Sequence, residues 1–184
     1  EIIPVDSEHS ALFQLLAGHD RSAVRRLVLS ASGGPFRGMS AEQVAAATPE
    51  SALRHPTWQM GPRITVDSAT LMNKALEVIE AHHLFGFSYD AIEVVVHPQS
   101  IVHAIVELVD GTLFAHMGEP DMRVPIRYAI THPLRSVRVA PPFSLAGLTL
   151  TFESPNVDVF PALRLGYEAG RAGAWPLLAG LPIP

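Results

Sequence analysis

The sequence predicts an α/β (α+β) domain built on a single mixed sheet, with helices packed on it and one long β-hairpin. Short apolar runs bounded by glycine or proline alternate with longer segments of helical periodicity, as expected for strands alternating with helices. Residues 101–117 form two apolar segments joined by Asp110-Gly111, a pair that suits the φ > 0 positions of a tight turn. The chain has 184 residues, 48% of them hydrophobic, which is enough for one sizeable core.

The first half of the chain is expected to hold mainly helices around one strand. Asp6 caps a helix that continues through the apolar residues 11–16. A buried strand, a glycine-rich break, a short helix and a proline-interrupted loop with one helical turn follow, at residues 26–30, 32–35, 40–47 and 48–62. The longest periodic segment, residues 67–85, predicts one helix that begins at Asp67 or Ser68 and stops at Gly86.

The second half is expected to begin with strands and to continue with helices. The predicted elements are a strand, the two hairpin strands, a helix, a strand and a helix, at residues 92–96, 101–109, 112–117, 122–131, 148–152 and 160–170. A loop with Pro141 and Pro142 lies between them, and residues 175–184 show no clear pattern. The edge of the hairpin can pair with a second copy of the chain, so we expect a homodimer.

Composition argues against several classes of function. The formal net charge of −5 argues against nucleic acid or an acidic membrane as the main partner. No apolar run approaches the roughly 18–20 residues that span a bilayer, and we expect no signal sequence. The chain has no cysteine, which excludes disulfides and thiolate metal sites and fits the reducing cytoplasm, where we expect the protein.

Two groups of polar residues are candidates for a metal site. Asp6 and Glu8 point the same way in an extended chain and offer the oxygen ligands that a hard divalent cation prefers. The same two residues can instead complement the dipole of a helix N-terminus. Asn73 and Glu77 share a helical face, with Lys74 beside them. This face either belongs to a metal and phosphate site or is a solvated surface with a Lys74–Glu77 ion pair.

Two loops are candidates for a ligand site. Residues 32–36 follow a strand, and their glycines let backbone N–H groups approach an anion; a plain turn is the alternative. They do not form a dinucleotide fingerprint, because G-x-G-x-x-G is absent and Pro35 prevents the helix start that this motif requires. His55, Trp58 and Met60 lie in a proline-bounded loop, which either closes over a ligand or plugs the core with its apolar side chains.

The nine histidines do not indicate a zinc enzyme. The H-E-x-x-H motif is absent, and His82 and His83 are adjacent, so they point in different directions on a helix. His97 and His103 lie near strand ends, where they can serve as site residues. Three others are expected to be structural: His9, His116 and His132.

In their order along the chain, seven motifs resemble the 1-deoxy-D-xylulose 5-phosphate reductoisomerase family. The resemblance extends from about Ile3 to Gly173, nearly the whole chain. The motifs are Asp6-Ser7-Glu8-His9, Ser32-Gly33-Gly34-Pro35-Phe36, His55-Pro56-Thr57-Trp58-Gln59-Met60-Gly61, Val66-Asp67-Ser68-Ala69-Thr70-Leu71-Met72-Asn73-Lys74, Glu77 with Ile79-Glu80-Ala81, His97-Pro98-Gln99-Ser100-Ile101-Val102-His103, and Gly118-Glu119-Pro120-Asp121-Met122-Arg123.

The resemblance implies roles for individual residues. A divalent cation, Mg²⁺, Mn²⁺ or Co²⁺, would be bound by Asp6, Glu8 and Glu77. The implied catalytic residues are Glu8, Lys74, Glu77 and His103. The substrate and its phosphate would contact Ser7, Ser32, His55, Trp58, Ser68, Asn73 and Lys74. Met60 and Gly61 would lie near the nicotinamide of NADPH.

The resemblance also implies an activity. Family members convert 1-deoxy-D-xylulose 5-phosphate to 2-C-methyl-D-erythritol 4-phosphate, by a rearrangement followed by hydride transfer from NADPH, in non-mevalonate isoprenoid biosynthesis. We therefore expect an NADPH-dependent, metal-dependent oxidoreductase and isomerase with a small phosphosugar substrate. The alternative is a folded or dimerising module without catalysis.

The sequence departs from the family pattern at both ends. It opens at Glu1 without an initiator Met and holds no glycine fingerprint, so we expect a fragment that binds NADPH weakly or not at all on its own and is inactive when isolated. After Gly173 it lacks the Asn-Ala-Ala-Asn-Glu-like segment of the family. We expect residues 1–145 to be the catalytic, metal- and substrate-binding domain, and residues 146–184 a linker strand and helix leading toward a C-terminal helical domain.

Overall fold

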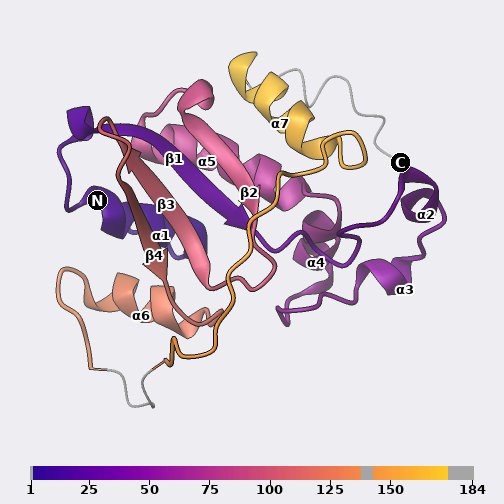
Figure 1. The fold of residues 1–184 in the computed structure, drawn as a ribbon, viewed down its shortest axis with the longest axis horizontal. Coiled ribbons are helices and arrows are strands. Elements are labelled where there is room, and N and C mark those ends of the chain that lie inside the picture. The colour runs from indigo at the N-terminus through magenta and orange to yellow at the C-terminus, as the bar shows by residue number, and fades with distance from the viewer. Residues whose placement is uncertain (1, 138–142, 174–184) are drawn as a thin grey trace.

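A four-stranded mixed sheet with the order β2-β1-β3-β4 forms the centre of the molecule (Figure 1). The computed structural model describes residues 2–137 and 143–173, so the loop around Pro141 and Pro142 and the tail at 175–184 lie outside the described residues. β1 (Val24–Ala31) and β2 (Ile92–Val96) are parallel. β3 (Val102–Leu108) is antiparallel to β1 and forms the hairpin with β4 (Leu113–Met117). The predicted single mixed sheet and its long hairpin are confirmed.

Helices cover one face of the sheet and extend past the carboxyl end of β1. α1 (Ser7–Leu16) and α5 (Met72–Phe85) lie behind the sheet in Figure 1 and share one core with it. Leu12, Leu29 and Val78 have no exposed surface, and full burial of each is worth roughly 1.5–3 kcal/mol. The other helices before the last are α2 (Ala41–Ala45), α3 (Pro49–Ala52), α4 (Pro62–Ala69) and α6 (Arg123–Thr131).

The helix predicted over residues 67–85 is broken. α4 begins at Pro62, because the fixed φ of proline suits the first helical position. Leu71 then takes a left-handed conformation, with φ of 60°, between α4 and α5. The prediction that Asp67 or Ser68 starts the helix is therefore wrong. The apolar periodicity conceals this break, since Leu71 keeps its side chain in the core.

The strand predicted at residues 148–152 does not form. Glu153 makes one antiparallel bridge to Val96 at the outer edge of β2, with N–O distances of 2.8 and 2.9 Å. In the same register residues 148–152 would lie opposite residues 97–101, beyond the end of β2 at Val96. The backbone N–H and oxygen of Thr151 instead pair with the side chains of Gln99 and His97. Phe152 instead stacks on the His97 ring at 4.7 Å between centroids.

α7 (Ala162–Arg171) confirms the last predicted helix and packs on α5 through glycines. A Cβ on Gly166 would lie 2.6 Å from the Cβ of Ala75. A Cβ on Gly170 would lie 2.4 Å from the ring of Tyr89, which is itself buried. The two glycines therefore allow α7 to approach closely, and a larger residue would push it away.

We expect Gly170→Ala to destabilise the chain although alanine is the better helix former. Helix propensity alone would stabilise by roughly 0.5–1 kcal/mol. Overpacking against Tyr89 costs about 1–3 kcal/mol and reverses the sign. Urea unfolding measures the difference, with Gly18→Ala as the control, because a Cβ there makes only an ordinary 3.7 Å contact. A Gly170→Ala chain as stable as the parent would show that α7 is not seated as described.

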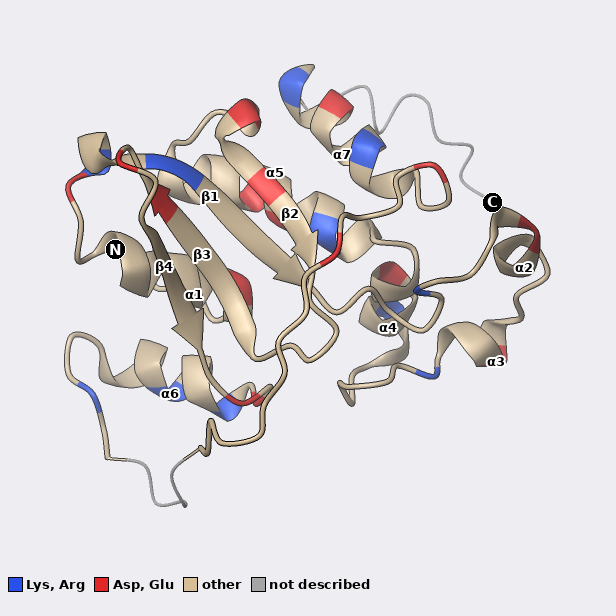
Figure 2. Cartoon of the chain, viewed as in Figure 1, with Lys and Arg blue, Asp and Glu red and all other residues tan. Residues whose placement is uncertain are grey.

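Figure 2 shows acidic and basic residues intermixed on helices and strands, with no extended basic face in this view. No helix within the described parts of the chain is long and apolar enough to cross a membrane.

Candidate active site

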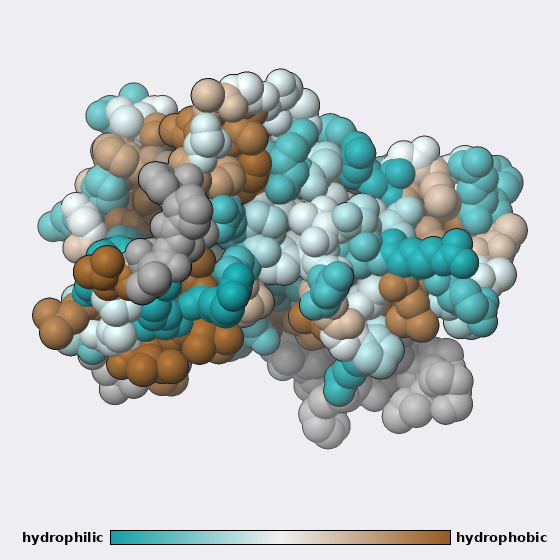
Figure 3. Space-filling model, turned by 90° about the horizontal axis from the view of Figure 1, so that it is seen from below, coloured by the Kyte–Doolittle hydropathy of each residue, from teal (hydrophilic) through white to brown (hydrophobic). Residues whose placement is uncertain are grey.

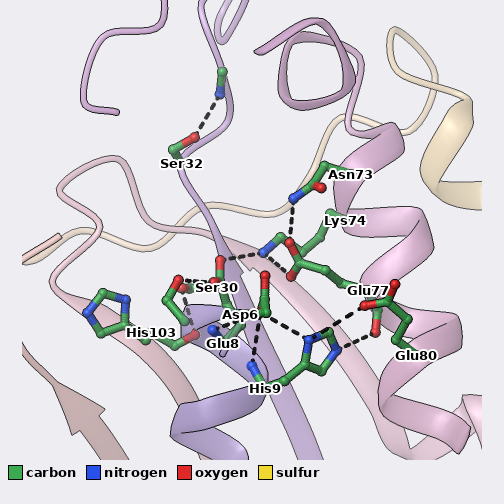
Figure 4. Close-up of polar contacts among 12 residues, drawn as sticks. Asp6, Glu8, His9, Ser30, Ser32, Asn73, Lys74, Glu77, Glu80 and His103 are labelled. Carbon is green, nitrogen blue, oxygen red and sulfur yellow. Dashed lines mark hydrogen bonds and ion pairs between the residues drawn. The ribbon is translucent and has the colours of Figure 1, made fainter. Parts of the chain in front are cut away.

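The three predicted metal ligands meet between α1 and α5 (Figure 4). Asp6 caps α1 and accepts hydrogen bonds from the backbone N–H groups of Glu8 and His9 at 3.0 and 3.1 Å. Glu8 lies in the first turn of α1, and Glu77 lies on α5. One carboxylate oxygen from each of Asp6, Glu8 and Glu77 lies within 4.8 Å of the others. Asp6 therefore has both proposed roles, as a helix cap and as a member of a carboxylate cluster.

The cluster holds its carboxylates in unequal environments. Burial and the charges of Asp6 and Glu8 raise the pKa of Glu77 well above its usual value, against the opposing effect of Lys74. Burial also opposes ionisation of Asp6, but the hydrogen bond and charge of His9, with the charge of Lys74, lower its pKa to about 2. Besides the effect of burial, the negative charges of Asp6 and Glu8 repel a charge on Glu77, and a divalent cation among the three carboxylates would relieve this repulsion.

Lys74 lies inside this cluster. Its Nζ donates to Glu8 Oε1 at 2.6 Å and to Glu77 Oε2 at 2.5 Å, and the side chain is 5% exposed. Burial opposes the charged ammonium, but the charges of Glu77, Glu8 and Asp6 outweigh it and raise the pKa of Lys74. Asn73 donates its side-chain amide to Glu77 as well. The alternative of a solvated Lys74–Glu77 pair is wrong, because both side chains are buried.

His9, which the sequence predicted to be structural, contacts the cluster with both of its ring nitrogens. Its Nδ1 lies 3.0 Å from Asp6 Oδ1, and its Nε2 lies 2.9 Å from the backbone oxygen of Glu77. Both ring nitrogens thus face acceptors. Burial opposes protonation, but the hydrogen bond and charge of Asp6 raise the pKa of His9. Glu80 approaches the same Nδ1 at 3.7 Å and is 59% exposed. The i,i+3 spacing of Asp6 and His9 at a helix start is the signal that could have indicated this contact.

Predicted substrate-binding residues line a cavity of about 200 Å³ next to the carboxylates. The predicted members of its wall are Ser7, Ser32, Trp58, Ser68, Asn73 and Lys74. Ser68 lies in the last turn of α4 and not at the helix start predicted from the sequence. A Cβ on Gly34 would lie 2.6 Å from the Ser68 carbonyl oxygen, so this glycine lets the loop after β1 close against α4.

The loop of residues 55–61 covers the cavity. His55 Nδ1 accepts hydrogen bonds from the backbone N–H groups of Thr57 and Trp58 at 3.1 and 2.8 Å. The ring proton is therefore on Nε2, which donates to Ser32 Oγ at 2.9 Å. Trp58 and Met60 line the cavity and are not part of the core, which favours a lid over a core plug. Gly61, the other predicted nicotinamide contact, caps α4 and lies outside this lining.

Acidification is expected to release this loop. Burial lowers the pKa of His55, so the closed loop holds the neutral ring. An imidazolium has a proton on Nδ1 and cannot accept these hydrogen bonds. Closure of the loop is therefore favoured above the ordinary histidine pKa of about 6.5, and it is progressively lost as pH falls from there through the lowered pKa of His55. Trp58 emission in a Trp175→Phe background should shift to the red between about pH 7 and pH 5. The shift should vanish in His55→Gln and persist in His19→Gln. An unchanged shift in His55→Gln would show that His55 does not hold the loop closed.

His103 and His97 have different surroundings. His103 lines the cavity, and burial lowers its pKa. His97 stacks on Phe152 and donates from Nδ1 to the backbone oxygen of Thr151 at 2.8 Å, so the structure does not bring it to the site. Ser30, Leu71, Ser100 and Met122 are among the lining residues to which the sequence assigned no role. Leu71, Ser100 and Met122 lie within the quoted motifs, whereas Ser30 is an ordinary strand position without a signal.

The fold and the site define an α/β domain that places an all-oxygen carboxylate cluster beside a cavity lined with hydroxyl, amide and ammonium donors. Comparison with known proteins gives the particular family. Two protein-family models match: "1-deoxy-D-xylulose 5-phosphate reductoisomerase C-terminal domain" over residues 2–85 and "DXP reductoisomerase C-terminal domain" over residues 117–179. The chain belongs to the 1-deoxy-D-xylulose 5-phosphate reductoisomerase family, as the resemblance of its motifs predicted.

Individual relatives agree with this assignment. The chain is 57% identical to a 1-deoxy-D-xylulose 5-phosphate reductoisomerase of Desulforamulus reducens, over 94% of this chain and 45% of that protein. It is 56% identical to the enzyme of the same name from Gloeobacter violaceus, over 94% and 44%. The chain thus spans about half the length of the curated relatives it matches.

Solved structures give the same result. A crystal structure of DOX-P reductoisomerase in complex with NADPH, fosmidomycin and magnesium has a TM-score of 0.86 and 43% identity, over 94% of this chain and 45% of that one. The enzyme from Zymomonas mobilis in complex with NADPH has a TM-score of 0.84 and 46% identity, over 92% and 44%.

Proposed function

We propose that this chain is the metal- and substrate-binding part of an NADPH-dependent enzyme that converts 1-deoxy-D-xylulose 5-phosphate to 2-C-methyl-D-erythritol 4-phosphate. The observation that carries this proposal is the meeting of a carboxylate cluster and phosphate-type donors in one cavity. The names of the relatives, and the NADPH, fosmidomycin and magnesium in related structures, support it. A non-catalytic module is not favoured, because it would not need this concentration of buried polar groups.

The carboxylate cluster fits a divalent cation. Asp6, Glu8 and Glu77 offer only oxygen ligands, which suit Mg²⁺, Mn²⁺ or Co²⁺ and leave coordination positions for substrate oxygens. When bound, the cation supplies Lewis acidity and a template that orients neighbouring oxygens of the substrate. His9 holds Asp6 and the backbone of Glu77 in place by hydrogen bonds from its two ring nitrogens. In this proposal the residues with catalytic roles are Glu8, Lys74, Glu77 and His103.

The remaining residues bind and enclose the substrate. The phosphate is held by Ser32, His55, Ser68, Asn73 and Lys74 in this proposal. Ser7, which donates to Glu8, contacts the substrate backbone next to the cation, and Trp58 covers it. Phosphate binding far from the reacting carbons fixes orientation and can lower the barrier by roughly 7–11 kcal/mol in favourable cases. Met60 and Gly61 are proposed to face the nicotinamide of NADPH, and the closed loop excludes water from the reaction.

We also propose the organisation of the whole protein. Residues 1–145 form the catalytic unit, and residues 146–184 connect it to a helical domain. The protein acts in the cytoplasm as a homodimer. β4 is an edge strand of the sheet among the described residues, which supports a dimer, since Leu113 is 58% exposed and can be covered by a second copy. Figure 3 shows further apolar side chains gathered on its left side, over α6, where Ile130 is 79% exposed.

Calorimetric titration of the chain with 1-deoxy-D-xylulose 5-phosphate, with and without Mn²⁺, tests the proposed function. We expect binding that requires Mn²⁺, because the sugar oxygens and the phosphate are held by different halves of the cavity. The unphosphorylated sugar is the matched control and should bind at least about 100-fold more weakly, as expected for the loss of charge-assisted hydrogen bonds. A folded chain that binds neither sugar in the presence of Mn²⁺ would contradict the proposal.

A further inference from the structure

Two of the proposed phosphate donors point at the proposed metal ligands. Lys74 Nζ donates to both Glu8 and Glu77, and the Asn73 amide donates to Glu77 (Figure 4). Both residues lie in the first turn of α5, and both line the cavity that also contains Ser68. The same two side chains are therefore within reach of the carboxylates on one side and of the proposed phosphate site beside Ser68 on the other.

We propose that Lys74 and Asn73 exchange partners when a divalent cation binds. Without the cation they neutralise and hydrogen-bond Glu8 and Glu77; with it they turn to the phosphate of the substrate. Cation binding thereby prepares the phosphate site, and the two ligands bind cooperatively. This inference rests on the proposed function, because it assumes a cation site on these carboxylates and a phosphate site in the same cavity.

Charge and hydrogen bonding give the direction of the exchange. A divalent cation among Asp6, Glu8 and Glu77 takes carboxylate oxygens that now accept from Lys74, and it repels the ammonium. The ammonium is buried and cannot move into water without losing its partners. A phosphate beside Ser68 is the one anion that the proposed substrate brings into this cavity, so the released ammonium and the phosphate stabilise each other.

The residue type at this position suits such an exchange. Lys74 is the only lysine of the chain, whereas all twelve other basic residues are arginines. A lysine ammonium is a compact charge on a flexible stem and can turn between two acceptors. A guanidinium would hold one carboxylate through two parallel hydrogen bonds and would resist that turn.

The single lysine also makes the exchange observable. Lysine labelled with ¹³C at Cε and ¹⁵N at Nζ gives one side-chain NMR signal in the full 184-residue chain. We expect saturating Mg²⁺ to shift this signal and inorganic phosphate to shift it again, while phosphate without Mg²⁺ leaves it nearly unchanged. A signal that stays in place while calorimetry shows Mg²⁺ bound would overturn the exchange and leave the metal site standing. Absence of any Mg²⁺ binding would overturn the exchange and the proposed metal site together.

Calorimetry of Lys74→Met measures the cooperativity. In the parent chain, phosphate should tighten Mg²⁺ binding about 10-fold, within the usual range for coupled sites. Lys74→Met should bind Mg²⁺ alone more tightly, because the competing ammonium is gone, and should lose most of the phosphate effect. Arg164→Met removes an exposed positive charge elsewhere and should keep the 10-fold effect, about the parent value.

The same phosphate effect in Lys74→Met as in the parent would overturn the exchange. Should Lys74→Met fail to fold, Asn73→Ala replaces it and is expected to lose part of the effect, since Asn73 is only half-buried and its removal leaves Lys74 in place. An undiminished effect in folded Asn73→Ala, together with an unmoved lysine signal, would equally reject the proposal.

Discussion

Replacing Glu77 with Gln should weaken Mn²⁺ binding about 100-fold or more. Even the loss of a residue that only hydrogen-bonds a metal ligand lowers metal affinity about 10–100-fold. The substitution keeps the shape of the side chain and its hydrogen bond to Lys74, but it replaces an anionic ligand with a neutral amide. The fold should be retained, because burial and neighbouring charges already oppose ionisation of Glu77. We expect thermal stability without metal to be equal to or higher than that of the parent, and electron paramagnetic resonance of free Mn²⁺ to measure the affinity.

Glu80→Gln is the matched control for this prediction. Glu80 lies three residues further along α5, is 59% exposed and contacts His9 at 3.7 Å without joining the carboxylate cluster. It should change Mn²⁺ affinity by no more than about 3-fold, as expected for an exposed charge near the site. Equal loss in both variants would mean that general negative charge, and not the cluster, attracts the cation.

Gly34→Ala should be the most damaging single-methyl substitution around the cavity. Its Cβ would lie 2.6 Å from the Ser68 carbonyl oxygen and 2.9 Å from the Ala69 Cα, both backbone atoms that cannot turn away. Overpacking costs about 1–3 kcal/mol, and the φ of +66° adds roughly 1 kcal/mol for a residue with a Cβ. Urea unfolding should therefore show a loss of about 2–4 kcal/mol, with phosphate affinity falling as Ser32 and Ser68 separate.

Gly38→Ala separates the cost of overpacking from the cost of the positive φ. Gly38 has a φ of +80°, but a Cβ there would meet nothing within 4 Å. Only the conformational cost of roughly 1 kcal/mol should remain, and phosphate affinity should not change. Equal effects of the two substitutions would show that the loop after β1 does not depend on its contact with α4.

The elements predicted correctly are those that local chemistry determines. The Asp110-Gly111 turn sets the hairpin, and Asp6 caps α1 through backbone hydrogen bonds. The break at Leu71 was missed because the apolar spacing continues through it, and only packing against the sheet holds a leucine in the left-handed region. The strand predicted at residues 148–152 does not form because β2 ends at Val96, before the residues that would pair with it, and periodicity does not show where a neighbouring strand ends.

The candidate site follows the same division. The order of the motifs indicated the carboxylates and the phosphate donors, and the structure brings Asp6, Glu8 and Glu77 together from two helices. The sequence could not show that Lys74 bonds Glu8, 66 positions away, because this contact exists only after α1 and α5 pack on the same sheet. For the same reason the sequence predicted a structural role for His9 without showing that both of its ring nitrogens contact residues of the cluster.

The most direct test of the account is a crystal structure of the chain with Mn²⁺ and 1-deoxy-D-xylulose 5-phosphate, with anomalous data at the manganese edge. We expect one strong anomalous peak coordinated by Asp6, Glu8 and Glu77. We also expect the sugar phosphate in contact with Ser32, Ser68 and Asn73 in the adjoining cavity. A manganese peak away from these carboxylates, or a phosphate bound outside this cavity, would contradict the account.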